Sequence, residues 1–265
     1  MKLKAIPLIC AVSLLSACGG SSHNTPTAGP LSGNWQFTLE RTNPNLKPRS
    51  ESGFLLQQND DLSGNLILKA AECSGAGTVT GSASGSNVAM VSSPFGLTVN
   101  LMGTVGSDQS SMSGNYTILV SGCNGLNNES STFTGVLIKP LSGTYTGTFT
   151  SNRFGTINVA WQSVTQGSNA TGSTNAPLGG MFTATPSGGG NYCYATSTVT
   201  GVISGTNVVL NLAGSDGTQL GAVNGTLSTD GTMLNGTFST FPQPGKPPCG
   251  SGDSGQVMLM LGSSS

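Results

Sequence analysis

Residues 30–40 contain the pattern that decides the fold, and they read Pro30-Leu31-Ser32-Gly33-Asn34-Trp35-Gln36-Phe37-Thr38-Leu39-Glu40. From residue 35 onward, apolar side chains alternate with polar ones. An alternation of period two is typical of a β-strand with one buried face and one wet face. The pattern returns along most of the chain, for example at 97–102 and 207–212. Residues with high helix propensity are scarce, so the sequence predicts an all-β protein.

The same stretch begins an internal repeat. Its first six residues return as Pro140-Leu141-Ser142-Gly143-Thr144-Tyr145. Further along, Thr78-Val79-Thr80-Gly81 returns as Thr198-Val199-Thr200-Gly201, and Ser84-Gly85-Ser86-Asn87 returns as Ser204-Gly205-Thr206-Asn207. The period of about 110 to 120 residues is too long for a solenoid unit. Each copy is therefore expected to be a domain, or half of a closed pair, and we place the two β domains at 31–140 and 141–262.

Each copy is expected to contain about eight short antiparallel strands with turn signals between them. Asp216-Gly217 and Asp230-Gly231 are typical of tight hairpin turns. A meander of this length favours closure into a barrel, because closure removes exposed strand edges. The sequence thus predicts two tandem antiparallel meander β-barrels. A pair of two-sheet β-sandwiches remains the alternative, since it uses the same alternation.

The second copy carries extra residues around 177–190. Together with Met181, Phe182, Tyr192 and Tyr194, this region is the first place to look for a ligand. The alternative interpretation is a long surface loop held by Cys193.

The N-terminus carries a targeting signal. Lys2 and Lys4 precede a short apolar run, which is too short to span a bilayer and predicts a signal peptide over 1–17. The segment Leu15-Ser16-Ala17-Cys18 resembles the lipobox of bacterial lipoproteins. That resemblance implies cleavage before Cys18, acyl chains on Cys18, and a mature protein tethered to a membrane. Because Gly19 and not aspartate follows Cys18, it also implies the outer membrane. Residues 18–30 would form a lipidated, flexible tether.

The body of the chain resembles the Gly/Ser/Thr-rich, Cys-containing β lipoproteins of bacteria. Gly33-Asn34-Trp35 is similar to the Gly-x-Trp that opens lipocalins, and Leu31-Ser32-Gly33 with Trp35 is similar to the start of avidin-type barrels. These resemblances imply a barrel whose cavity holds a small molecule. An eight-stranded barrel is just wide enough to hold one small ligand or to be filled by side chains.

The low content of charged residues restricts the kinds of partner that the protein is expected to bind. Only 7% of the residues are charged, and the formal net charge is −1. Removal of residues 1–17 takes away two lysines and leaves a net charge of about −3. No basic patch is present in the sequence, which argues against nucleic-acid binding.

Four of the six cysteines are expected to form disulfides. Cys10 lies in the signal peptide and Cys18 is the lipid site, which leaves Cys73, Cys123, Cys193 and Cys249. An even number in an exported chain indicates disulfides. Three pairings exist in principle, and the repeat favours Cys73–Cys123 and Cys193–Cys249. Each bond would be worth about 4 kcal/mol on the chain-entropy view. No metal site is expected, since no CxxC pair exists and the only histidine, His23, lies in the tether.

No catalytic constellation is recognisable. A Ser-His-Asp mechanism needs a histidine close to the serine, and His23 lies in the tether. Asp108, Asp216 and Asp230 sit at predicted turns, where aspartate commonly bonds its own backbone. The best candidates for ligand binding are Trp35, Trp161, Tyr192 and Tyr194, although core packing is the default role expected for aromatic residues at such strand positions.

The sequence therefore predicts a lipid-anchored β protein of the bacterial outer membrane, with no cofactor and no enzymatic activity. Its first expected role is structural, or interaction with a partner protein of the cell envelope. The alternative role is binding of a small hydrophobic ligand in a lipocalin-like or avidin-like cavity.

Overall fold

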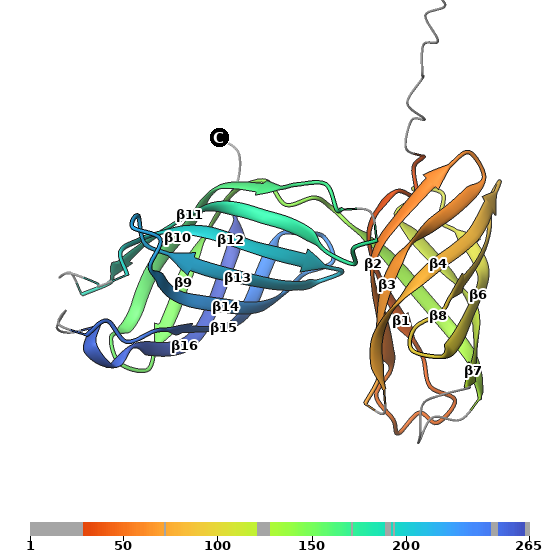
Figure 1. Cartoon of the computed structure of the whole chain (residues 1–265), viewed down its shortest axis with the longest axis horizontal. Coiled ribbons are helices and arrows are strands. Elements are labelled where there is room, and N and C mark those ends of the chain that lie inside the picture. The colour runs from red at the N-terminus through yellow and green to blue at the C-terminus, as the bar shows by residue number, and fades with distance from the viewer. Residues whose placement is uncertain are drawn as a thin grey trace, which may run out of the picture.

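A computed structural model of the chain describes residues 29–71, 73–120, 128–170, 172–188, 192, 194–244 and 249–262. Figure 1 shows two β-barrels joined in tandem. Each is a closed, eight-stranded antiparallel meander, in which neighbours in the chain are neighbours in the sheet. The prediction of two meander barrels is confirmed, and the sandwich alternative is wrong. Closure pairs the first strand of each barrel with its last, so that no strand edge is left open.

Barrel 1 contains the strands β1 (Gly33–Leu39), β2 (Arg49–Gln58), β3 (Asp61–Lys69), β4 (Ser74–Ser84), β5 (Asn87–Ser92), β6 (Leu97–Val105), β7 (Ser111–Val120) and β8 (Glu129–Ile138). Barrel 2 contains the strands β9 (Gly143–Ser151), β10 (Gly155–Gln166), β11 (Ala176–Pro186), β12 (Thr196–Ser204), β13 (Asn207–Ala213), β14 (Gln219–Leu227), β15 (Met233–Thr240) and β16 (Asp253–Leu261). A short 3-10 helix, Cys249–Ser251, precedes the last strand. Among the described residues, no helix is long and apolar enough to cross a bilayer.

The alternation predicted from the sequence is the alternation between the inside and the outside of each barrel. In β6, Leu97, Val99 and Leu101 are buried while their neighbours are more exposed. The inward rows form two separate apolar cores, one in each barrel. Inward side chains are withdrawn from water at about 25 cal/mol per Å² of apolar surface, which makes this burial the main driving force for folding.

A leucine and a glutamine close the same end of each barrel. In barrel 1, the Leu31 N–H donates to Gln57 Oε1 at 3.1 Å. In barrel 2, the Leu141 N–H donates to Gln166 Oε1 at 3.0 Å. Both leucines are buried. The repeated sequence thus forms the same end closure in both barrels.

The predicted hairpin turns are confirmed. Gly217 and Gly231 have φ of 79° and 76°, in the left-handed region that tight turns need. Asp216 accepts from the Thr218 N–H at 2.9 Å, and Asp230 accepts from the Thr232 N–H at 3.0 Å. These aspartates serve turn geometry, as expected from their positions.

The interpretation of the region around 177–190 as an inserted surface loop is wrong. Residues Ala176–Pro186 form the strand β11, which pairs with β10 on one side and β12 on the other. Phe182 is buried in the core, while Met181 points outward and is exposed. Glycines in the middle of this strand weaken the apolar alternation, which is why the sequence pattern leaves a surface loop as an alternative here.

Candidate functional site: the cleft between the barrels

The two barrels meet through one turn of barrel 2. The turn between β12 and β13 lies on the outer wall of barrel 1, so that one end of barrel 2 abuts the side of barrel 1 (Figure 1). The Asn34 side chain donates to the Gly205 carbonyl at 2.8 Å and accepts from the Gly205 N–H at 2.6 Å. The Gln36 Oε1 accepts from the Thr206 N–H at 3.2 Å. Polar side chains of β1 therefore form hydrogen bonds with the backbone of this turn, as the backbone of a neighbouring strand would.

Two buried apolar side chains flank Asn34 on the neighbouring strands. Phe54, Asn34 and Ile138 are directly opposite one another across β2, β1 and β8. All three are on the outer side of barrel 1, yet all are buried. Phe54 and Ile138 belong to the hydrophobic cluster of barrel 2. The outer wall of barrel 1 thus contributes to the core of its neighbour, which opposes separation of the barrels.

A cleft with a volume of about 1130 Å³ opens next to this contact. Barrel 1 forms one wall of the cleft with the outer faces of β2, β3 and β4. The other side is formed by the β10–β11 connection around Ser168 and Asn169 and by the β14–β15 turn with Asp230. Most of the lining is apolar. The volume is slightly above the usual range for sites that take small organic molecules, which is about 300 to 1,000 Å³.

Two rows of outward side chains across β2, β3 and β4 determine which ligand groups the barrel 1 wall can contact. One row carries Leu56, which is 40% exposed. The other continues from Phe54 to Asn65 and Thr78. These side chains offer apolar surface with neutral hydrogen-bonding groups at its border. Lys139 and Asp230 are the charged residues of the lining. Hydrogen bonds from Ser228 and Thr232 lower the pKa of Asp230 to about 2, so it stays ionised within its turn.

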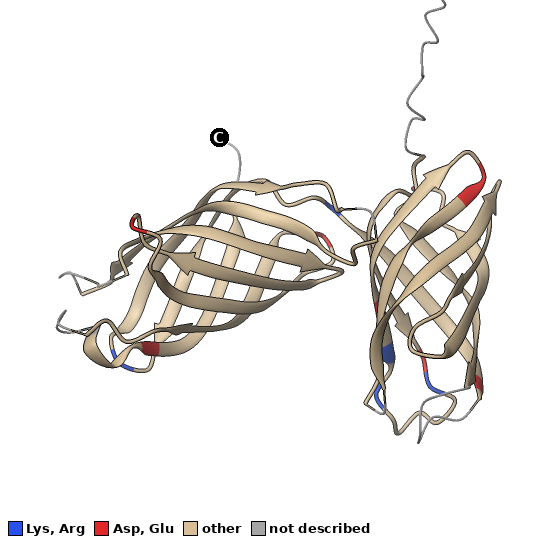
Figure 2. Cartoon of the chain, in the orientation of Figure 1, with Lys and Arg blue, Asp and Glu red and all other residues tan. Residues whose placement is uncertain are grey.

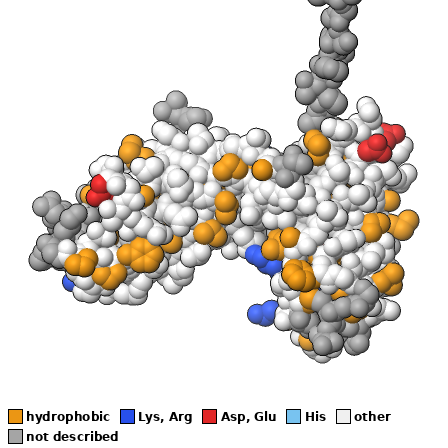
Figure 3. Space-filling model, viewed as in Figure 1, with side chains coloured by type: hydrophobic (Ala, Val, Ile, Leu, Met, Phe, Trp, Pro, Cys, Tyr) orange, Lys and Arg blue, Asp and Glu red, His pale blue; other side chains and the backbone are white. Residues whose placement is uncertain are grey.

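Charged side chains are sparse over the whole molecule, and most lie near the barrel ends (Figure 2). Apolar side chains are scattered over the visible face, several of them near the junction of the barrels (Figure 3). The cleft therefore lies in a surface of low charge.

The predicted ligand residues Trp35 and Trp161 lie in the barrel cores and do not line the cleft. Both are fully buried. Trp35 stacks on Phe37 at 5.7 Å between ring centroids, and its indole N–H donates to the Leu31 carbonyl at 2.8 Å. Trp161 packs against Tyr145 and Phe182. Their contacts are those of core packing, the default role that the sequence indicated for them.

Tyr192 and Tyr194 lie at the far end of barrel 2, away from the cleft. Their rings make an edge contact at 5.4 Å. Tyr192 donates to Asp253 Oδ2 at 3.1 Å, and Tyr194 donates to the Phe241 carbonyl at 2.7 Å. Burial, with the nearby Asp253 carboxylate, raises the pKa of Tyr192, so the hydroxyl stays neutral. Both tyrosines are committed to closing this end of the barrel.

The predicted covalent sites are only partly within the described residues. Cys18, the signal peptide, most of the tether, Cys123 and Cys193 lie outside them. Cys73 is disulfide-bonded. The pairings Cys73–Cys123 and Cys193–Cys249 stay predictions.

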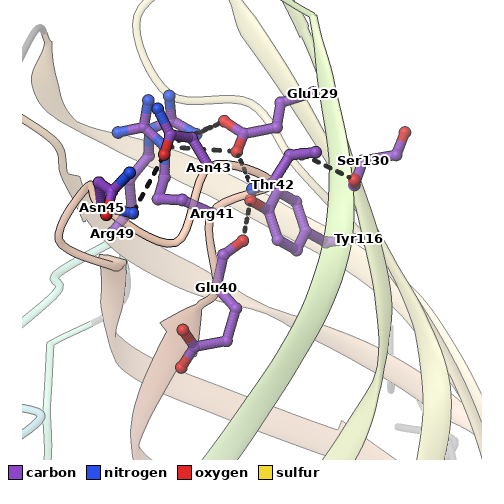
Figure 4. A network of polar contacts seen from close by, with 9 residues as sticks. All are labelled: Glu40, Arg41, Thr42, Asn43, Asn45, Arg49, Tyr116, Glu129 and Ser130. Atoms are coloured by element: carbon purple, nitrogen blue, oxygen red, sulfur yellow. Dashed lines mark hydrogen bonds and ion pairs between the residues drawn. The ribbon is translucent and has the colours of Figure 1, made fainter.

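A polar network closes the end of barrel 1 that is lower in Figure 1, opposite the end closed by Leu31 and Gln57 (Figure 4). Glu129 at the start of β8 is ion-paired with Arg41 at 3.2 Å and with Arg49. Burial raises the pKa of Glu129, but the Thr42 N–H and the Arg49 guanidinium outweigh it, and the net shift is downward. Tyr116 donates to the Glu40 carbonyl at 2.6 Å. In barrel 2 the register places Asp253 at the position of Glu129, where Ser151 donates to it at 2.8 Å.

Sequence reasoning missed one residue of this end. Glu51 in β2 points into barrel 1 and has no exposed surface. Ser92 donates to its Oε1 at 2.6 Å, and its Oε2 has no hydrogen-bond partner. Burial raises the pKa of Glu51 to about 7, and the Ser92 hydroxyl lowers it in part. The sequence does carry a sign of this burial. Arg49, Glu51 and Gly53 occupy every second position of 49–53, and these positions face inward in β2.

Among the described residues, no group of three or more His, Cys, Asp or Glu side chains is arranged to hold a metal ion.

Comparisons with known proteins add little to this geometry. No protein-family model matches the chain, and no curated protein matches it. Among solved structures, the chain matches the crystal structure of kievitone hydratase from Nectria haematococca, with 9% sequence identity and a TM-score of 0.23. The match covers 87% of this chain and 89% of that chain. A score this low supports no conclusion about activity.

Proposed function

We propose that the chain is a lipid-anchored binding protein of the bacterial outer membrane, which holds a small apolar molecule in the cleft between its two barrels. The observation that carries this proposal is the cleft of about 1130 Å³, lined mainly by apolar surface. Large concave apolar surfaces with a few polar groups at the border are the usual sites for small ligands. The barrel interiors are occupied by packed side chains, so the cleft takes the place of the expected lipocalin-like cavity.

The chemistry of the walls defines the ligand class. Phe54, Leu56 and Ile138 supply apolar contact, while Asn65 and Thr78 supply neutral donors and acceptors. One lysine and one aspartate border the cleft, and the aspartate is engaged by its own turn. A neutral, largely apolar molecule with one or two hydrogen-bonding groups fits this lining best.

Binding is tested with the neutral fluorophore N-phenyl-1-naphthylamine and the soluble chain from Ser21 onward, which contains every described residue. We expect saturable fluorescence enhancement. Leu56→Asp should weaken it at least about tenfold, because a charged group on the cleft wall opposes burial of an apolar ligand. Leu119→Asp is the matched control, because Leu119 is a 51% exposed outward leucine on β7, away from the cleft. Absence of saturable binding, or an equal loss in both variants, would contradict the proposal.

The lipid anchor is tested separately. Cys18→Ala should release the protein from membranes, because firm anchoring requires several acyl chains. Retention of this variant in the outer-membrane fraction would exclude the anchor, whatever the cleft binds.

A structural or interaction role in the envelope is the second candidate function. It is favoured by large apolar side chains that stand on outer barrel faces. Met102, Met258 and Met260 are 67%, 49% and 56% exposed. Exposed methionines are common on surfaces that meet partners of variable shape. Replacing Met258 and Met260 together by threonine should then abolish crosslinking to an envelope partner without changing fluorophore binding.

A further inference from the structure

The two barrels differ in the side chains that fill one layer of their interiors. In barrel 1 this layer lies near the lower end. The register places Arg49 and Glu51 opposite Leu39 and Phe37, and in barrel 2 Ile157 and Val159 take the equivalent positions. Likewise Ser92 is opposite Val79, and Leu212 is opposite Val199. Barrel 2 shows that this fold accepts an apolar interior here. Barrel 1 instead carries a buried carboxyl group, which costs stability when it is ionised.

Glu51 is poorly satisfied in the closed barrel. Its single hydrogen bond comes from Ser92, and its second oxygen has no partner. An ionised carboxylate accepts several hydrogen bonds in water, so ionisation of Glu51 in this place requires water to reach it. Close to the Glu51 carboxyl, the chain leaves the sheet at Ser92, which is the last residue of β5.

The segment after Ser92 closes the barrel in an unusual way. Residues 93–96 cross the inner face of β4, where only glycines leave room. A Cβ on Gly75 would lie 1.6 Å from the Phe95 ring, and a Cβ on Gly77 would lie 2.4 Å from the backbone of Pro94. Pro94 is buried, whereas Phe95 is 66% exposed. In barrel 2 the equivalent strand β13 instead continues to Ala213, opposite Thr198.

Backbone strain is stored in this closing segment. Phe95 has a φ of 45°, a left-handed conformation that is costly for a residue with a large side chain. The Ser93 N–H donates to the Thr78 carbonyl at 3.1 Å, and the Leu97 N–H donates to the Pro94 carbonyl at 2.8 Å. Release of the segment relieves the backbone strain at Phe95.

We propose that residues 93–96 form a pH-sensitive closure of the lower end of barrel 1, whose opening is coupled to release of the proton of Glu51. In the closed state the carboxyl is neutral and bonded to Ser92. In the open state water enters beside Ser92 and solvates the carboxylate.

The other groups around Glu51 do not titrate in the same range. β1 and β3 place Phe37 and Leu68 opposite it, and β4 contributes glycines. Arg49 is ion-paired with Glu129, whose pKa is lowered, so the pair stays charged. Burial raises the pKa of Tyr116, which therefore stays neutral. Protonation changes between pH 5 and pH 7 are thus assigned to Glu51.

The linkage has a defined direction. The closed state holds its proton up to a pKa of about 7, whereas the solvated carboxyl of the open state has an ordinary pKa near 4.5. The open fraction therefore rises with pH between these two values, by up to about tenfold per pH unit, and levels off above pH 7.

The test measures hydrogen exchange of the Ser93 and Leu97 amides by NMR on the soluble chain from Ser21 onward, corrected for the intrinsic effect of pH. We expect the opening constant to rise at least about tenfold from pH 5 to pH 7. The Gly214 and Gly217 amides, bonded in the corresponding turn of barrel 2, serve as the internal control and should not change.

Three variants make the assignment specific. Glu51→Gln should remove the rise, and Glu51→Val, which copies Val159, should do the same if the amide variant folds poorly. Ser92→Ala should move the midpoint to higher pH, because the Ser92 hydroxyl favours the ionised carboxylate. An unchanged rise in Glu51→Gln, or constant protection of Ser93 and Leu97 while the Glu51 carboxyl titrates, would overturn the proposal.

Discussion

Asn34 and Gly205 lie 171 positions apart in the chain and exchange two hydrogen bonds, of 2.8 Å and 2.6 Å, through the Asn34 amide and the Gly205 backbone. The asparagine side chain thereby imitates the backbone of a strand partner. This pair fixes the turn of barrel 2 on the wall of barrel 1, beside the cleft. Orientation of the barrels, and with it the shape of the cleft, depends on this contact.

Gly205→Ala should separate the barrels. A Cβ at this position would lie 2.3 Å from Gln36 Oε1 and 2.5 Å from the Ser52 Cβ. Gly85→Ala is the matched control, because Gly85 occupies the equivalent turn with a nearly equal φ, 58° against 55°, and has nothing within 4 Å. Both variants pay about 1 kcal/mol for a left-handed alanine. Only Gly205→Ala should increase the radius of gyration measured by small-angle X-ray scattering. An equal change in both variants would contradict the docking role.

The two tryptophans should differ in what their hydrogen-bonding group contributes. Trp35 donates to the Leu31 carbonyl, whereas the Trp161 indole N–H has no partner. Trp35→Phe leaves a buried carbonyl without its donor, while Trp161→Phe removes a donor that was already unsatisfied. We expect Trp35→Phe to lower the free energy of unfolding by about 1 to 2 kcal/mol more than Trp161→Phe does. Urea unfolding followed by circular dichroism measures the difference, and a larger loss for Trp161→Phe would refute it.

Glu51 should make the stability of the protein fall as pH rises. Its pKa is about 7 in the folded state and near 4.5 when solvated, so folding is favoured most below pH 4.5. The contribution is lost progressively up to pH 7 and amounts to about 3 kcal/mol. Urea unfolding at pH 5 and pH 7.5 should show this loss in the natural chain. In Glu51→Gln the loss should be absent; if it persists there, another group is responsible.

The predicted disulfide pairing follows the internal repeat. Cys73 is disulfide-bonded, and the predicted pairs are Cys73–Cys123 and Cys193–Cys249. Peptide mapping by mass spectrometry without reduction should recover these two linked peptide pairs. Reduction should lower the free energy of unfolding by about 4 kcal/mol per bond on the chain-entropy view. A link between the two copies would instead show that the barrels are intertwined.

Local pattern predicted much of the fold because β-strands and tight turns have local signatures. The alternation around Trp35 and Phe37 marks inward and outward positions, and Asp216-Gly217 marks a hairpin. The strand β11 has no clear signature in the sequence, because Gly179 and Gly180 interrupt its alternation. Pairing with β10 and β12 overrides that weak local preference.

The candidate site could not be predicted in this way. The turns at Gly85 and Gly205 have nearly the same sequence, yet only the second meets a partner surface. Phe54 alternates like any strand residue, but it faces outward into the core of the other barrel. Sequence reasoning placed binding at aromatic residues, whereas the cleft is formed where two walls meet.

By itself, the sequence determined the all-β class, the duplication, the strands with a clear apolar alternation and the turn aspartates, because these depend on neighbours within a few residues. Only the tertiary structure decided which end of barrel 2 rests on barrel 1, where the cleft lies, and that Glu51 is buried with one hydrogen bond. Those properties arise from contacts between residues far apart in the chain. Their energies depend on register and on the exclusion of water, which a linear pattern does not record.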